Sequence, residues 1–190
     1  MSTILNSDCS LVAFNTVFTY KGHYPAHAFI GARARERKLL SAGTVLWKCS
    51  QFSLINPSTG SITEWWCSCD DLDTTLRRCQ NLRISLRRYA RARLAVIWEW
   101  QNSMENLLRA RLMQPVYAFV GPTKWQNTQF SIDKENTELP ANRLTLIGGD
   151  TQYCIPNLTT THIAELSRTS ADHIPAGPQA MKSFIGGRVG

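Results

Sequence analysis

The sequence predicts an α+β fold, a single domain in which mixed or antiparallel sheets pack against a long basic helical region on one side. Three observations support this class. Strand-like and helix-like segments follow each other in blocks rather than in regular alternation. The connections between them are longer than those of a doubly wound parallel sheet. The chain has 190 residues, of which 43% are hydrophobic, so it is long enough to bury one core.

The domain is expected to span residues 1–168. Residues 169–190 contain Pro175, Pro178 and a terminal Gly-Gly-Arg-Val-Gly sequence, which predict an extended or flexible tail. The start of the chain lacks the basic and apolar regions of a signal peptide. No apolar stretch approaches the roughly 18 residues of a membrane span. We therefore expect a cytoplasmic protein, or one that is delivered into a target cell and acts there.

The first two predicted elements are a strand and a helix. Residues 10–20 alternate in polarity and are rich in β-forming side chains, which predicts a strand. Residues 25–43 predict a helix, because Pro25 suits its first turn and Gly43 its end.

A β-hairpin is predicted next. Residues 44–55 and 62–68 have strand-like composition, and the turn-forming residues of segment 56–61 lie between them. The two strands are therefore expected to pair.

A long helical region is predicted from the acidic segment 70–73 to about Met113, with a break near Gln80 and Asn81. Its apolar side chains recur at helical spacing, which predicts a buried face. These side chains are Leu86, Ala90, Ile97, Trp100, Met104, Leu107 and Leu108.

Strands dominate the remainder of the predicted fold. The apolar segment 115–121 is typical of a buried strand, and segments 143–149 and 151–156 predict two more. Residues 159–167 predict a short capped helix.

Positive charge is concentrated in the helical region. The net charge is +7 and the pI about 9.3, and nine of the fifteen arginines lie between Arg77 and Arg111. No acid occurs between Asp73 and Glu99. A basic protein attracts polyanions. We take four arginines at near-helical spacing as candidate nucleic-acid-binding residues. They are Arg83, Arg87, Arg88 and Arg91.

This arginine run has three interpretations. It could be the solvated outer face of an amphipathic helix. Like charges four residues apart repel, however, and no acid within the run relieves them. The other interpretations are therefore a face that binds an anionic ligand such as nucleic acid, and a face that docks an acidic protein.

Motifs for metal or phosphate binding are not apparent. His23 and His27 have zinc-like spacing, but Pro25 lies between them and no HExxH glutamate accompanies them. The pair Cys67 and Cys69 is too closely spaced for ordinary zinc ligation. We expect no metal, and we expect the six cysteines to be mostly reduced.

Several short segments resemble the layout of another group of proteins. These segments are GTVLWKCS at 43–50, STGSIT at 58–63 followed by EWW, ELP at 138–140 and GGDTQYCIPNL at 148–158. Their order is similar to that of small bacterial ADP-ribosyltransferase toxins. That family has a mixed α+β fold and uses NAD as its substrate. Its members carry a basic residue on a first strand, a serine- and threonine-containing central motif, and a glutamate on a late strand.

The resemblance implies roles for six residues. Lys48, in place of the family's arginine, would contact a phosphate or ribose of NAD, and Ser61 would belong to the central motif. Trp65 or Trp66 would pack on the nicotinamide. The catalytic position falls on Glu138 or on Gln152, of which Glu138 is preferred because it is a carboxylate.

The resemblance predicts an NAD-dependent transferase that acts as a toxin or effector on a macromolecular target, possibly a nucleic acid. Two alternative functions are compatible with the arginine run. One is a non-catalytic nucleic-acid-binding protein that uses the arginine-rich helix. The other is an interaction protein whose arginine face docks an acidic partner, for instance an antitoxin. Because a toxic enzyme is often bound by a neutralising partner, the transferase and docking hypotheses are compatible.

Overall fold

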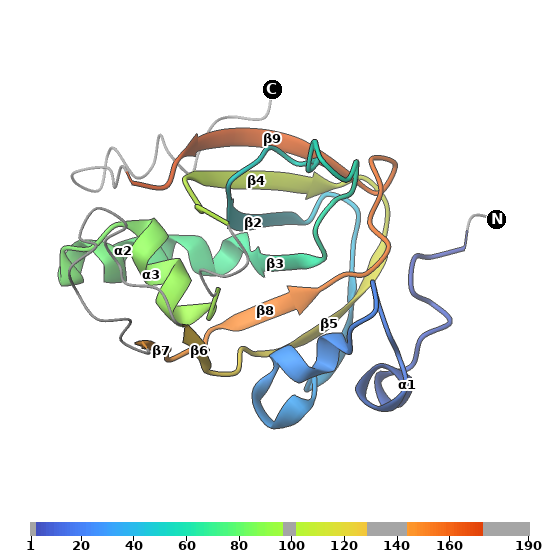
Figure 1. The fold of residues 1–190 in the computed structure, drawn as a ribbon. Helices are drawn as coiled ribbons and strands as arrows, with labels where there is room; N and C mark the ends of the chain where they lie inside the picture. The colour runs from blue at the N-terminus through green and yellow to red at the C-terminus, as the bar shows by residue number, and fades with distance from the viewer. Residues whose placement is uncertain (1–2, 97–101, 129–143, 173–190) are drawn as a thin grey trace.

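The computed structural model describes residues 3–96, 102–128 and 144–172. Seven strands form one sheet in the order β1-β5-β8-β3-β2-β4-β9, and every neighbouring pair is antiparallel. Figure 1 shows most of this order from β9 to β5 across the molecule. The strands are β1 (Glu36–Leu40), β2 (Val45–Ser50), β3 (Trp65–Ser68), β4 (Asn106–Leu112), β5 (Val116–Pro122), β8 (Thr151–Cys154) and β9 (Ile163–Ser170).

The helices are short, and a small second sheet accompanies them. The second sheet consists of β6 (Gln126–Thr128) and β7 (Leu144–Leu146). The α-helices are α1 (Leu11–Thr16), α2 (Leu72–Leu82) and α3 (Leu86–Arg93), and the 3-10 helices are η1 (Pro25–Ala28), η2 (Ile30–Ala32) and η3 (Cys69–Asp71). None of the helices in the described part of the chain is long and apolar enough to cross a membrane.

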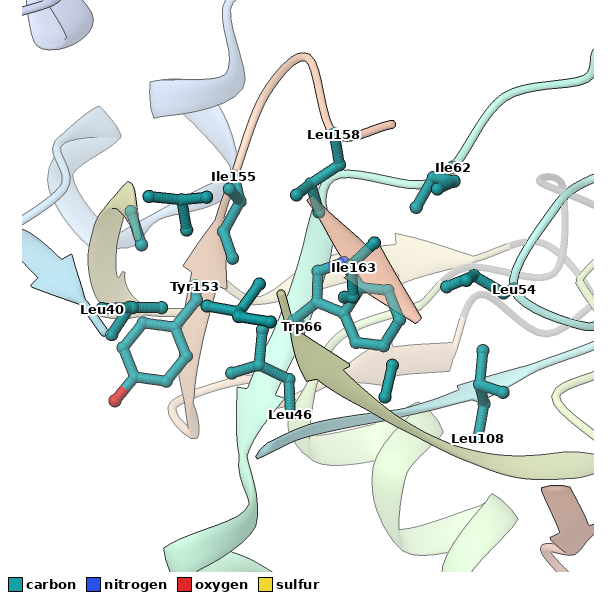
Figure 2. Close-up of a cluster of buried hydrophobic side chains, with 14 of the residues drawn as sticks. Leu40, Leu46, Leu54, Ile62, Trp66, Leu108, Tyr153, Ile155, Leu158 and Ile163 are labelled. Carbon is teal, nitrogen blue, oxygen red and sulfur yellow. The ribbon is translucent and has the colours of Figure 1, made fainter. Parts of the chain in front are cut away.

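One face of the sheet buries a core around Trp66, which is fully buried. Leu40 of edge strand β1 and Ile163 of edge strand β9 belong to the same cluster, so the sheet curls around it. Figure 2 shows Trp66 in the middle of this core, between Tyr153 and Leu108.

Helices cover the opposite face in two places. Trp47 and Cys67 pack there against α2 and α3. Farther along the same face, Phe14 of α1 stacks on Phe119 of β5, with ring centroids 3.8 Å apart. Because both faces are covered, both sides of the central strands are apolar.

The predicted strand at 10–20 is wrong, because α1 forms there. Ser10 caps this helix through a hydrogen bond that its side chain accepts from the Ala13 amide. Burial of Phe14 against the sheet then stabilises a six-residue helix that its β-forming side chains would not favour alone.

The predicted helix at 25–43 is also wrong. Only η1 and η2 form, and Gly31 and Ala32 have φ values of 69° and 55°, which interrupt any α-helix. The following residues form edge strand β1 instead, because pairing with β5 supplies the backbone hydrogen bonds.

The long basic helical region does not form. Arg83 adopts a left-handed conformation (φ 53°) and ends α2, close to the predicted break. Beyond α3 the chain returns to the sheet as β4, in which Leu107 and Leu108 are buried on opposite faces. Two consecutive leucines are buried here because both faces of the strand are covered, and not because they lie on the apolar face of a helix. Residues 97–101, with Ile97 and Trp100, lie outside the described residues.

The prediction for the C-terminal part is partly confirmed. The predicted hairpin forms, because β2 pairs antiparallel with β3. Strands β7 and β8 form within the predicted segments, and β5 runs one residue beyond its segment, to Pro122. The helix predicted at 159–167 is wrong, because strand β9 starts at Ile163 and pairs with β4. Strand β9 runs to Ser170, inside the predicted tail, and residues 173–190 lie outside the described residues.

Candidate functional site

A cavity of about 690 Å³ opens against strands β2, β3 and β8. This volume is in the range of sites for small organic ligands. Besides the strands, it is lined by the segment before and within η1, by the loop between β2 and β3, and by the chain that follows α3. Four of the residues singled out in the sequence line it together: Lys48, Ser61, Trp65 and Gln152.

Lys48 and Gln152 approach this cavity from opposite faces of the sheet. Residues paired across antiparallel strands share a face. The register of β2 on β3 continues to Lys48 opposite Trp66, and Trp66 lies opposite Tyr153 in β8. Gln152 precedes Tyr153 and therefore points to the other side. The lining thus includes residues from both faces of the sheet.

Lys48 is a buried lysine, with 9% of its surface exposed. Its Nζ lies 4.8 Å from the centroid of the Trp66 ring. Among the described residues it has neither an ion pair within 4.0 Å nor a hydrogen bond. Burial lowers the pKa of Lys48 to about 8, although the carboxylates of Glu64 and Glu165 act to raise it.

The side chain of Gln152 is also buried, with 8% of its surface exposed. No described residue hydrogen-bonds its amide. Buried amides normally have partners. A ligand in the cavity could therefore supply them.

Glu64 is the acid that the sequence reasoning missed. It is the one carboxylate among the described residues that line the cavity. Its Oε2 lies 3.7 Å from the Nζ of Lys21, and its side chain is 19% exposed. The residue stands directly before Trp65 and Trp66 in the sequence, but only the pairing of β2 with β3 places it near Lys48.

The two adjacent tryptophans have different environments. Trp65 is half-buried, lines the cavity and contacts Phe29 edge-on, with ring centroids 5.5 Å apart. Trp66 is fully buried and donates a hydrogen bond from Nε1 to the Thr63 carbonyl at 2.9 Å. The role considered for Trp66, stacking on a nicotinamide ring, is therefore incompatible with its burial. Trp65 is the one that a ligand can reach.

Ser61 lies in the loop that joins β2 to β3. The segment Asn56–Gly60 forms a turn, in which the Gly60 amide donates to the Asn56 carbonyl and Gly60 has a φ of 64°. The Ser61 hydroxyl lies 2.7 Å from the Thr59 hydroxyl. The turn thus presents Ser61 to the cavity.

The four candidate arginines do not share one exposed face. Arg91 is 5% exposed, and its guanidinium donates to the carbonyls of Val96 and Asn102. It therefore supports the chain after α3 instead of facing solvent. Arg83 and Arg88 are exposed.

Acids from distant parts of the sequence reach this basic region. Arg87 is half-buried and forms an ion pair with Asp172 at 3.0 Å. Arg93 contacts Asp150 in the same way, at 2.6 Å. The absence of acids within the run therefore does not leave all its arginines unpaired.

Glu138 lies outside the described residues, so its position relative to the cavity stays a prediction. The described residues contain no group of three potential metal ligands, and His23 and His27 are both exposed. All six cysteines are free thiols.

Comparisons with protein-family models, curated proteins and solved structures found no match for this chain.

Proposed function

We propose that this protein is an ADP-ribosyltransferase-like enzyme, a toxin or effector that binds NAD in the cavity and transfers ADP-ribose to a macromolecular target. One observation carries the proposal. Lys48 in β2 and Gln152 in β8 are about a hundred residues apart in sequence, yet β2 and β8 flank β3 directly. The cavity opens against these three strands and is also lined by Ser61 of the central motif.

The lining residues from the two faces of the sheet suit different parts of NAD. The aromatic and amide groups of Trp65 and Gln152 suit the nicotinamide, which offers a flat ring and a carboxamide. On the other face, the ammonium group of Lys48 suits the pyrophosphate, whose negative charge would pair with it. NAD would thus contact residues from both faces of the sheet.

The chemistry requires a carboxylate. As the bond between ribose C1′ and the nicotinamide nitrogen breaks, positive charge develops on the ribose, and a nearby carboxylate stabilises it. The acceptor nucleophile then bonds to C1′. Gln152 can hydrogen-bond a hydroxyl group but carries no charge. We therefore assign this role to Glu64, and Glu138 is the alternative.

The test is release of nicotinamide from labelled NAD, with cell lysate, RNA and DNA as acceptors. We expect turnover by the wild type and a loss of about 10²-fold or more in Glu64→Gln, typical for removal of one stabilising group. Glu36→Gln, an exposed change on edge strand β1, is the matched control and should keep full activity.

Three outcomes are informative. Loss of activity in Glu138→Gln but not in Glu64→Gln would move the catalytic role to Glu138. Transfer of label to only one acceptor would name the target class. The absence of turnover with every acceptor would contradict the transferase proposal.

The alternative function as a nucleic-acid-binding protein is supported by exposed arginines on α2 and α3. Arg77, Arg78, Arg83 and Arg88 are exposed. Arg77 forms an ion pair with Asp73. An acidic protein partner, such as an antitoxin, would bind the same surface by the same charge complementarity.

A further inference from the structure

Lys48 has an environment that pairing with a pyrophosphate does not require. A buried ammonium group normally has a carboxylate within ion-pair distance. Lys48 has none among the described residues, although Glu64 and Glu165 influence it at longer range. The backbone of Lys48 belongs to strand β2, and its amine lies over the Trp66 ring. The amine is therefore held inside the protein and does not extend into solvent.

This environment makes the amine a nucleophile near neutral pH. Burial lowers its pKa to about 8. Roughly a tenth of such amines are uncharged at pH 7, against well under a thousandth for an ordinary lysine. The uncharged amine is the form that attacks carbonyl carbon, and desolvated lysines of this kind form imines in proteins.

The surroundings also suit the product. The Lys48 nitrogen attacks the carbonyl carbon and a C–N bond forms. One amine hydrogen and one proton from solution then leave with the oxygen as water, so that a protonated imine remains. Its positive charge lies where the ammonium charge was, over the face of Trp66 and in the field of Glu64 and Glu165. Lys21 is the cation that opposes it, and Lys21 is paired with Glu64.

The lining near Lys48 indicates the class of carbonyl compound. Ser50, Ser61 and Thr63 bring hydroxyl groups to the cavity, and Leu54 adds an apolar wall. Ser50 lies two positions after Lys48 in β2, and Leu54 belongs to the same buried cluster as Trp66. A small aldehyde or ketone that carries its own hydroxyl groups would match this mixture. We propose that the part of the cavity around Lys48 is an imine-forming site for a small hydroxyaldehyde or hydroxyketone.

The test uses the wild-type chain, glycolaldehyde as the probe and cyanoborohydride to trap the imine, followed by peptide mapping. We expect the trapped adduct on Lys48 to form about tenfold or more faster than on exposed Lys38 at pH 7. The rate at Lys48 should saturate with glycolaldehyde concentration and rise with pH through about 8. The rate at Lys38 should stay linear in concentration.

Labelling of Lys48 no faster than Lys38, or without saturation, would overturn the proposal. Because the wild type alone decides this, a folding defect in a variant cannot obscure the result. Lys48→Arg should lose the saturable adduct while Lys38→Arg retains it, and a saturable adduct that persists in Lys48→Arg would also contradict the assignment. The labelling experiment uses no NAD, so a negative result for the imine proposal is distinguishable from a negative result for the transferase proposal.

Discussion

Lys48 lies on the face of β2 that packs on Trp66, and its charge has consequences for stability. Its pKa is about 8 in the folded chain, below the ordinary 10.5, because burial disfavours the charged form. Protonated Lys48 therefore opposes folding below pH 8. This penalty disappears as pH rises from about 8 through 10.5, and its upper limit is about 3 kcal/mol.

We expect Lys48→Met to raise the free energy of unfolding at pH 7, because methionine fills similar space without a charge. The difference in free energy of unfolding between Lys48→Met and the wild type should shrink by pH 10, because Lys48 is then mostly uncharged in the folded wild type. Urea unfolding at the two pH values measures this. Lys38→Met, at an exposed site, should show no such pH dependence. A destabilised Lys48→Met at pH 7 would mean that the ammonium group makes a net favourable interaction.

At the scale of elements, the end of α3 is attached to the sheet near the cavity. The Arg93 guanidinium donates to Asp150 from Nε at 2.8 Å, and the Thr123 hydroxyl donates to the Arg93 carbonyl at 2.8 Å. The Gly148 amide donates to the Ala92 carbonyl. These contacts connect α3 to the turn before β8, and so help to position the chain that lines one side of the cavity.

We expect Asp150→Asn to lower the free energy of unfolding by roughly 1–2 kcal/mol, because it removes a charge-assisted and partly buried contact. Asp73→Asn removes the partner of Arg77 in a more exposed pair within α2, and should change stability by less than about 0.5 kcal/mol. Denaturant unfolding of both variants checks the contrast. Equal losses of stability in the two variants would show that the greater burial of the Arg93–Asp150 pair does not increase its contribution.

At the scale of the whole molecule, the net charge of +7 is distributed over a surface in which only some arginines are accessible. Arg88→Ala should leave stability almost unchanged. If this surface binds RNA, the change should weaken binding and reduce the salt slope by about one. Arg91→Ala should instead lower the free energy of unfolding by about 3 kcal/mol, because it removes a buried guanidinium group and leaves two part-buried carbonyls without its donors.

The two measurements are unfolding in urea and binding of a single-stranded RNA at several salt concentrations. Unchanged binding in Arg88→Ala and in Arg83→Ala would argue against nucleic acid at this surface. A stable Arg91→Ala variant with weakened binding would contradict the structural role of Arg91.

Much of the sheet could be predicted from local sequence. Segments 44–55, 62–68 and 115–121 have strand composition and turn signals, and each coincides with all or most of a strand. The helix prediction at 25–43 failed because pairing of β1 with β5 outweighs local propensity. Hydrophobic periodicity also led to a wrong helix prediction at Leu107 and Leu108, because a strand covered on both faces does not alternate between apolar and polar residues.

The sequence by itself determined the α+β class, the β2–β3 hairpin and the residue types available for chemistry. It also indicated Lys48, Ser61, Trp65 and Gln152, which line one cavity. Only the tertiary structure decided which neighbours those residues have. It buried Trp66 and Arg91, brought Glu64 into the cavity, and paired Arg87 with Asp172 across 85 positions of sequence. The physical reason is that pairing register and burial set each group's charge and access, and both depend on contacts between distant segments.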